Sequence, residues 1–174
     1  QGMANARAMA SYAATAVGCR DDQVLVLSTG VIGQQLNMTK IRAGIADAAP
    51  HLSPNGGADV SRAILTTDTK PKVYAIYHPE RSEGRNTPYA IGGMCKGAGM
   101  IHPNMATMLA VITTDAKILP TLLDQALRAA VNVSFNRISI DGDMSTNDTV
   151  LVLANGASGY EIGNSELGEF SEAL

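Results

Sequence analysis

The sequence contains no tryptophan and few other aromatic residues, with two phenylalanines and five tyrosines among 174 residues. With so few aromatic side chains, the core is expected to consist of alanine, valine, isoleucine, leucine and methionine. Hydrophobic residues still make up 45% of the chain and charged residues 17%, which is typical of a globular domain and not of a disordered segment. The length suits one core of ordinary size, so a single domain is expected.

Long apolar runs and basic clusters are also missing. The longest apolar runs, such as residues 24–27 and 108–112, are far too short to cross a bilayer. The net charge is -3, and no basic cluster of the kind that tracks a phosphate backbone is present. We therefore expect no membrane insertion and no nucleic-acid partner.

Cysteine is scarce, and the two residues present, Cys19 and Cys95, do not have the spacing of metal ligands. Two cysteines without an evident partner suggest a reducing compartment. The sequence begins at Gln1 without an initiator methionine, and both of its ends run into helical patterns. We expect a piece of a longer chain.

Helical and extended patterns alternate along the chain. Helices are expected at residues 3–17, closed by Gly18, at 37–49, capped by Asn37 or Thr39, and at 119–131. Strands are expected at 24–27 (buried), 73–78, 89–91, 108–112, 137–140 and 150–154. Residues 79–88 are expected to form a hairpin tip, and residues 92–105 are too rich in glycine for regular structure. This interleaving favours an α/β sandwich.

Two glycine-containing segments are candidate binding sites. Ser28, Thr29 and Gly30 follow an apolar run, and a strand end followed by glycine can aim backbone N–H groups into a cleft as an oxyanion hole. Residues 92–99 place Lys96 among four glycines, which suits a carboxylate or phosphate ligand. Taken alone, the first segment is better explained as an ordinary turn and the second as a surface loop.

Oxygen ligands recur between Asp141 and Asp148, as in a calcium-binding loop. The resemblance fails where it matters most, because Thr146 replaces the required glycine and Val152 the bidentate glutamate. A turn held by its own Asx and Ser/Thr hydrogen bonds is the better interpretation. The histidines, His51, His78 and His102, have no serine nucleophile motif beside them, and none is assigned a catalytic role.

Ala106 and Thr107 stand between the glycine-rich segment and an apolar run. A threonine freed at its amino terminus carries its own general base, the new α-amine, whose ordinary pKa is about 8. The small Ala106 leaves room for the threonine hydroxyl to attack its carbonyl. By position alone, however, a threonine at this place is simply a good β-strand former.

Several strings acquire more meaning when they are taken together. They are STGVIG (28–33), AILTTDT (63–69), IGGMCKGAGMIHPNMATML (91–109), ITTDA (112–116), SFNRISIDGD (134–143) and STNDTVLVLANG (145–156). In this order they resemble the ornithine acetyltransferase family, over nearly the whole chain. The long string through Thr107 is highly specific, whereas STG or TTD alone would mean little.

The resemblance implies a reaction and a set of site residues. The precursor would cleave itself between Ala106 and Thr107, and Thr107 would then carry an acetyl group from N-acetylornithine to glutamate. Some members of the family also accept acetyl-CoA, and no cofactor is expected. Thr29 and Gly30 would form the oxyanion hole, while Thr66 and Lys96 would contact the amino-acid substrate together with Thr107.

The resemblance also implies an architecture. The fold would be the layered α/β sandwich of this family, which is self-processing and similar in mechanism to N-terminal-nucleophile hydrolases. Residues 1–174 would form one incomplete catalytic domain, with 1–106 ending the first cleaved chain and 107–174 beginning the second. Two cleaved precursors would assemble into a heterotetramer, in the cytoplasm or, in a eukaryote, in the mitochondrial matrix or plastid. The polar stretch 79–88 is longer than the family pattern predicts.

Two other functions compete with acetyl transfer. A self-processing amidase or aminopeptidase would share the fold, but such enzymes favour a serine nucleophile and lack the KGAGMI string found here. A non-catalytic module would use Lys96 and the glycines to hold an anion and leave Thr107 inert. An uncut chain in the intact protein would favour that module.

Overall fold

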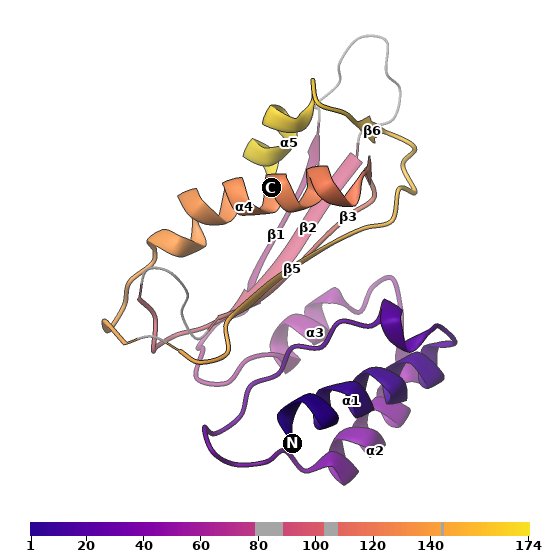
Figure 1. Ribbon diagram of the computed structural model, residues 1–174, viewed down its shortest axis with the longest axis vertical. Coiled ribbons are helices and arrows are strands. Elements are labelled where there is room, and N and C mark those ends of the chain that lie inside the picture. Colours follow the sequence, from indigo (N-terminus) through magenta and orange to yellow (C-terminus); the bar gives the residue numbers. More distant parts are fainter. Residues whose placement is uncertain (79–88, 103–107, 144) are drawn as a thin grey trace. The chain divides into compact units, whose positions relative to one another are not determined.

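The computed structural model describes residues 1–78, 89–102, 108–143 and 145–174. They form two compact units, Gln1–Ala58 and Asp59–Leu174. The chain combines helices with sheets, which confirms the predicted mixed α/β class (Figure 1). The layered sandwich of the predicted family remains a prediction.

The first unit is helical. It contains α1 (Gly2–Val17), η1 (Asp21–Gln23), α2 (Met38–Ala48) and η2 (Ala49–His51), and α3 (Gly57–Ala63) begins at its end. Helix α1 stops at Gly18, whose φ of 77° is accessible to glycine without strain. At the start of α2, the Asn37 side chain accepts a hydrogen bond from the Lys40 N–H at 3.1 Å. Both predicted helices and both of these end signals are confirmed.

Residues 24–27 do not form the predicted buried strand. They lie outside regular structure, and Leu25 is 57% exposed. A strand is stable only when a neighbouring strand completes its backbone hydrogen bonds, and no strand is present between residues 1 and 58, all of which are described. The apolar composition of the segment suited a strand, but this unit supplies no partner for it.

The second unit is built on a four-stranded sheet with the order β1-β2-β3-β5. The strands are β1 (Lys72–His78), β2 (Tyr89–Lys96), β3 (Leu109–Thr114) and β5 (Thr149–Ala154). The first three are antiparallel neighbours, and β5 runs parallel to β3. The chain between β3 and β5 contains β4 (Lys117–Ile118), α4 (Pro120–Val133) and η3 (Phe135–Arg137), and β4 pairs with β6 (Glu161–Ile162) before α5 (Leu167–Ala173).

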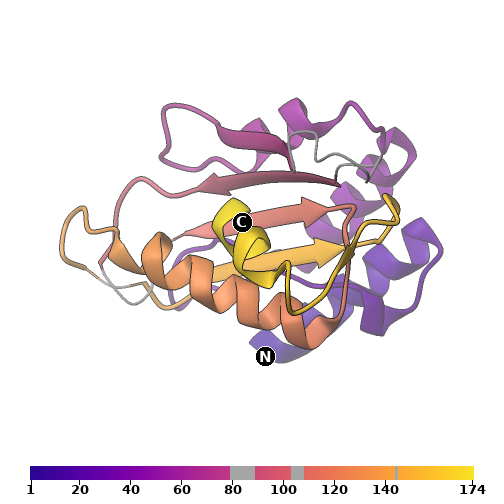
Figure 2. The same ribbon diagram turned by 90° about the horizontal axis from the view of Figure 1, so that it is seen from above.

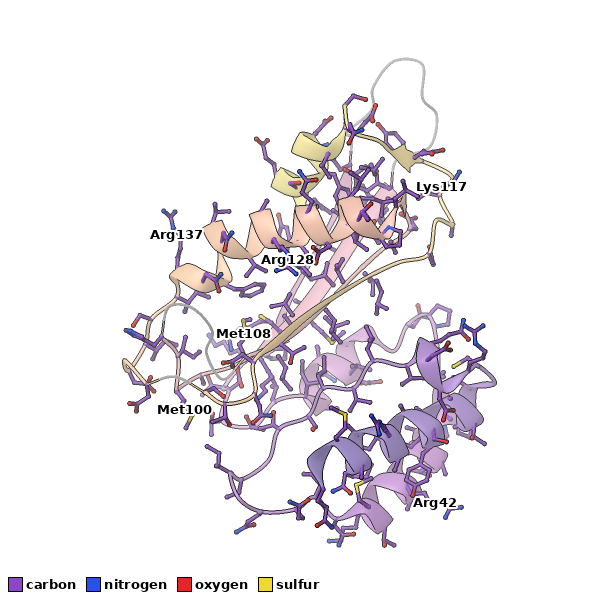
Figure 3. The ribbon with its side chains drawn as sticks, in the orientation of Figure 1. Arg42, Met100, Met108, Lys117, Arg128 and Arg137 are labelled. Atoms are coloured by element: carbon purple, nitrogen blue, oxygen red, sulfur yellow. The ribbon has the colours of Figure 1, made fainter. Side chains whose placement is uncertain are left out.

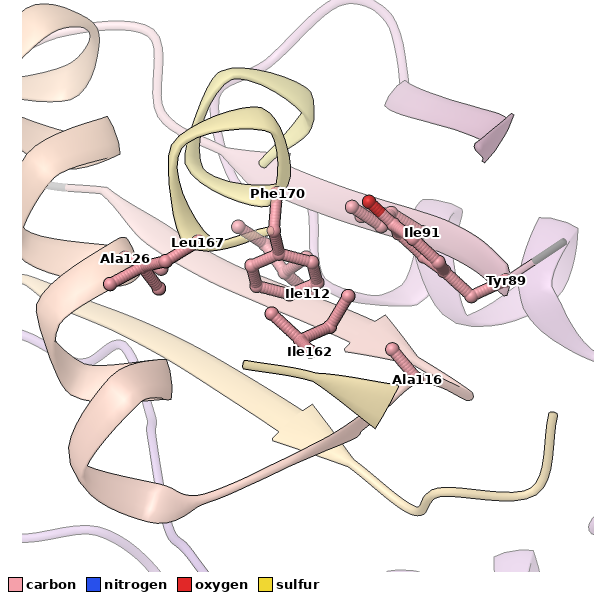
Figure 4. Close-up of a cluster of buried hydrophobic side chains, with 8 residues drawn as sticks. All are labelled: Tyr89, Ile91, Ile112, Ala116, Ala126, Ile162, Leu167 and Phe170. Atoms are coloured by element: carbon pink, nitrogen blue, oxygen red, sulfur yellow. The ribbon is translucent and has the colours of Figure 1, made fainter. Parts of the chain in front are cut away.

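Helices α4 and α5 lie on the same face of this sheet (Figures 1 and 2). Their apolar side chains meet those of the strands in one cluster: Tyr89, Ile91, Ile112, Ala116, Ala126, Ile162, Leu167 and Phe170 (Figure 4). The Tyr89 ring lies 5.6 Å from the Phe170 ring and 5.2 Å from the Tyr160 ring. The expectation of an entirely aliphatic core is therefore wrong, because three of the few aromatic residues, Tyr89, Tyr160 and Phe170, meet at this cluster.

Two further segments differ from the predictions. Residues 92–96, expected to be irregular, complete β2, because pairing with strands on both sides outweighs the weak strand preference of glycine. Residues 137–140 are not a strand, since 135–137 form a 3₁₀ turn and Ile140 N–H donates to the Ile101 carbonyl at 2.8 Å. The predicted hairpin tip at 79–88 lies outside the described residues, although its flanking strands β1 and β2 do pair.

None of the described helices is both long and apolar enough to cross a bilayer.

Candidate active site

Lys96 is the last residue of β2, opposite Leu109 in the register with β3. Although it is a lysine, only 1% of its surface is exposed. Burying an ammonium group is costly unless nearby groups compensate its charge. The explanation of residues 92–99 as a plain surface loop is therefore wrong at Lys96, and its neighbours need to be identified.

Asp68 is one of these neighbours. Its side chain is fully buried, and its Oδ1 accepts hydrogen bonds from Gly97 N–H, at 2.8 Å, and from the Lys72 ammonium. Lys72 also donates to the Gly97 carbonyl at 3.1 Å. Burial raises the pKa of the Asp68 carboxyl, but the hydrogen bonds and the positive charge of Lys72 outweigh it and bring that pKa below its usual value. Asp68 is therefore a carboxylate at neutral pH.

Asp148, just before β5, is the second acidic neighbour. Burial lowers the pKa of Lys96, while the charges of Asp68 and Asp148 act in the opposite direction. The Asp148 Oδ1 accepts a hydrogen bond from Met108 N–H at 2.7 Å, and Thr149 N–H donates to the Met108 carbonyl at 3.1 Å. Both backbone groups of the residue that follows Thr107 in the sequence are thus held by the start of β5.

Asp141 makes an equivalent contact on the other side of residues 103–107. It accepts hydrogen bonds from the backbone N–H groups of Met100 and Ile101, the latter at 2.9 Å. These hydrogen bonds lower the pKa of the Asp141 carboxyl, the one from Met100 most of all. Met100 and Met108 lie at the same end of the sheet (Figure 3). The chain on both sides of residues 103–107 is therefore anchored by carboxylates of one loop.

That loop is also the segment that superficially resembled a calcium site. Asp143 N–H donates to Asp141 Oδ1 at 3.3 Å, and Asn147 N–H donates to Ser145 Oγ at 3.2 Å. These are the local turn hydrogen bonds that the sequence predicted. In the part of the chain that the structure describes, no group of three or more His, Cys, Asp or Glu residues is arranged to hold a metal ion.

The other predicted site residues fall in three places. Thr66 is exposed in the second unit, two residues before Asp68. Thr29 and Gly30 are exposed in the first unit, in a segment without regular structure. Ala106 and Thr107, the predicted cleavage site and nucleophile, lie outside the described residues. Within the second unit, therefore, the site gathers Lys96, Asp68 and Asp148, with Thr66 close to Asp68 in the chain.

Comparison with known proteins decides the family. A model of the ArgJ family matches residues 1–174, the whole chain. The chain belongs to the ArgJ family. This membership confirms the resemblance to ornithine acetyltransferases that the motifs indicated.

Several relatives named "Arginine biosynthesis bifunctional protein ArgJ" are similar over most of the chain. The protein of Symbiobacterium thermophilum is 55% identical over 159 residues, which are 91% of this chain and 39% of the relative. That of Geobacter sulfurreducens is 46% identical over 177 residues, covering all of this chain and 44% of the relative. A relative from Heterostelium pallidum whose name includes "mitochondrial" is 47% identical over 160 residues, 91% of this chain and 35% of the relative. The chain thus spans about two fifths of the length of these ArgJ relatives.

Sequence reasoning found Lys96 of this ArgJ chain but missed its acidic neighbours. Asp68 stands in the TTD string and Asp148 in the TND string, both of which were noticed only as parts of longer motifs. A signal was present, since Asp68 stands four positions before β1 and Asp148 stands directly before β5. Position before a strand does not reveal which strand ends lie together in the sheet. The contacts of both aspartates depend on this arrangement of strand ends.

Proposed function

We propose that this chain is part of an enzyme of arginine biosynthesis that transfers an acetyl group from N-acetylornithine to glutamate. The observation that carries the proposal is the match of the ArgJ family model to the whole chain. The names of the relatives support it, since they describe bifunctional proteins of arginine biosynthesis. Acetyl-CoA is a possible second donor, and the transfer itself requires no cofactor or metal.

The proposed reaction begins with self-cleavage. The Thr107 hydroxyl attacks the Ala106 carbonyl, the peptide bond to the threonine nitrogen breaks, and water hydrolyses the resulting ester. The freed α-amine then acts as the general base for the same hydroxyl. The hydroxyl attacks the acetyl carbonyl of N-acetylornithine, and ornithine leaves as the amine. The amino group of glutamate next attacks the acetyl ester, which yields N-acetylglutamate and restores the threonine.

The remaining residues of the proposed site would stabilise the oxyanion and bind the amino-acid substrate. Thr29 and Gly30 would donate hydrogen bonds to the oxyanion that forms on the acetyl carbonyl. The buried Lys96 suits a substrate carboxylate, because an ammonium withdrawn from water pairs strongly with an anion. Thr66 would contact the same amino-acid substrate.

In the complete protein, two cleaved precursors would form a heterotetramer, in the cytoplasm or in the mitochondrial matrix or plastid of a eukaryote.

Mass spectrometry of the full-length protein tests this function directly. We expect two chains in place of one, and the chain that begins with Thr107 should gain the mass of one acetyl group when N-acetylornithine is added. Added glutamate should remove that acetyl group and yield N-acetylglutamate. Release of acetate at the same rate without glutamate would indicate a hydrolase instead. A single uncut chain that binds the amino acid without reacting would indicate a non-catalytic module.

Replacing Lys96 tests the proposed contact with the substrate carboxylate. The change Lys96→Met keeps most of the side-chain volume and removes the charge. Loss of one charge-assisted hydrogen bond costs about 1.5–3 kcal/mol, so KM for N-acetylornithine or glutamate should rise by about ten- to a hundredfold. Steady-state kinetics with each substrate measure this. Unchanged KM values for both would remove Lys96 from the site.

A further inference from the structure

The hydrogen bonds of Asp68 account for only one of the two oxygens of its carboxylate. Its Oδ1 accepts from Gly97 N–H and from Lys72, but its Oδ2 is buried and accepts no hydrogen bond from any of the described residues. A buried carboxylate oxygen without a partner is destabilising and rare in folded proteins. The nearby positive charge of Lys96 provides a reason for its presence, since the two side chains interact electrostatically.

We infer that Asp68 is a positioning residue for substrate binding, which holds the Thr66 segment against the end of β2 and balances the buried charge of Lys96. This inference rests on the proposed function of Lys96 as the partner of a substrate carboxylate. Asp68 itself need not touch the substrate.

The geometry at the end of β2 supports the holding role. Gly97 follows Lys96 directly and has a φ of 148°, a conformation that residues with side chains rarely adopt. Strand β2 ends at Lys96, and Asp68 accepts the N–H group of the residue that follows it. Lys72 binds both Asp68 and the Gly97 carbonyl, which connects the start of β1 to the same place. Thr66, two residues before Asp68, belongs to the segment held there.

The electrostatics support the balancing role. Within the described part of the chain, Asp68 and Asp148 are the acidic groups whose charges act on Lys96, and Lys72 is the cation bound to Asp68. Each acid accepts one backbone N–H through its Oδ1, Asp148 that of Met108 and Asp68 that of Gly97. The Oδ2 of Asp68 is in addition a buried oxygen that accepts no hydrogen bond from the described residues. Without Asp68, Lys96 would lose its proton at a lower pH and bind a carboxylate less well.

A double-mutant cycle in the full-length enzyme tests the inference. Asp68→Asn retains an oxygen that can accept the Gly97 N–H but removes the charge. We expect it to raise KM for the substrate that Lys96 binds by about tenfold, and further as the pH rises, with kcat within about twofold. In a Lys96→Met background the same change should have little further effect on KM. Asp124→Asn, which removes a carboxylate from an exposed pair with Arg128 on α4, is the matched control and should leave KM unchanged.

Several outcomes overturn the inference and separate it from the proposed function. An equal rise in KM with and without Lys96 would mean that Asp68 acts only on the structure, and an unchanged KM in Asp68→Asn would mean that it does not act at all. Either result leaves the role of Lys96 intact. If Lys96→Met changes the KM of neither substrate, the substrate contact proposed for Lys96 and the supporting role of Asp68 both fail, whereas acetyl transfer itself is tested by the mass spectrometry above. Asp68→Glu keeps the charge but lengthens a buried side chain, so its KM can rise through the holding role alone, while the pH dependence of KM should stay as in wild type. If Asp68→Asn does not fold, this pH dependence provides the test, and a KM for Asp68→Glu that rises with pH more steeply than in wild type would overturn the balancing role.

Discussion

A full-length protein with Thr107→Ala is expected to remain a single chain and to lose acetyl transfer, by roughly 10⁴-fold or more. The change removes the hydroxyl that would attack the Ala106 carbonyl and later carry the acetyl group, so processing and turnover should fail together. Gel electrophoresis, amino-terminal sequencing and an acetyl-transfer assay measure the two effects. In the wild-type protein, the second chain should begin Thr-Met-Leu-Ala-Val.

The matched variant is Thr107→Ser, which keeps the attacking oxygen. It is expected to cleave, more slowly than wild type, and to keep part of the activity. Failure of the 174-residue chain alone to cleave would not bear on the proposal, because it spans only about two fifths of its relatives. A full-length wild-type protein that stays uncut and still transfers acetyl groups would refute self-cleavage as a requirement.

The second large effect is expected at Thr29. If its hydroxyl donates to the oxyanion, Thr29→Ala should lower kcat by about 10²–10³-fold and change KM little, since this hydrogen bond matters mainly in the transition state. The measurement is steady-state kinetics of the cleaved enzyme with N-acetylornithine and glutamate. A backbone donor at Gly30 would survive the change and leave residual activity.

An exposed threonine in the same unit provides the control for this experiment. Thr39→Ala on α2 makes the same chemical change at an exposed residue that has no role in the proposed site, and it should leave kcat unchanged. Normal turnover in Thr29→Ala would exclude its hydroxyl from the mechanism. A loss of kcat shared equally by Thr39→Ala would point to a general loss of folded protein.

Local signals in the sequence determined much of the second unit and both long helices of the first. Glycine at position 18 ends α1 and Asn37 caps α2, because these effects depend on the residue and its immediate neighbours. The apolar patterns of β1, β3, β5 and α4, which are alternating, continuous or amphipathic, were recognised for the same reason, with boundaries one or two residues away. The glycine-rich string also singled out Lys96 as a candidate binding residue and led to the family that the comparisons confirm.

Tertiary structure alone decided whether an extended segment has a partner and which charges meet. Residues 24–27 have the composition of a strand but no neighbouring strand in their unit, whereas the glycines of β2 have a strand on each side. Asp68 and Asp148 are 80 positions apart in the numbering, yet both act on Lys96 because β1, β2, β3 and β5 lie in one sheet. Strand pairing and charge compensation depend on groups distant in the chain, so the sequence pointed to Lys96 but predicted neither its acidic neighbours nor its contacts.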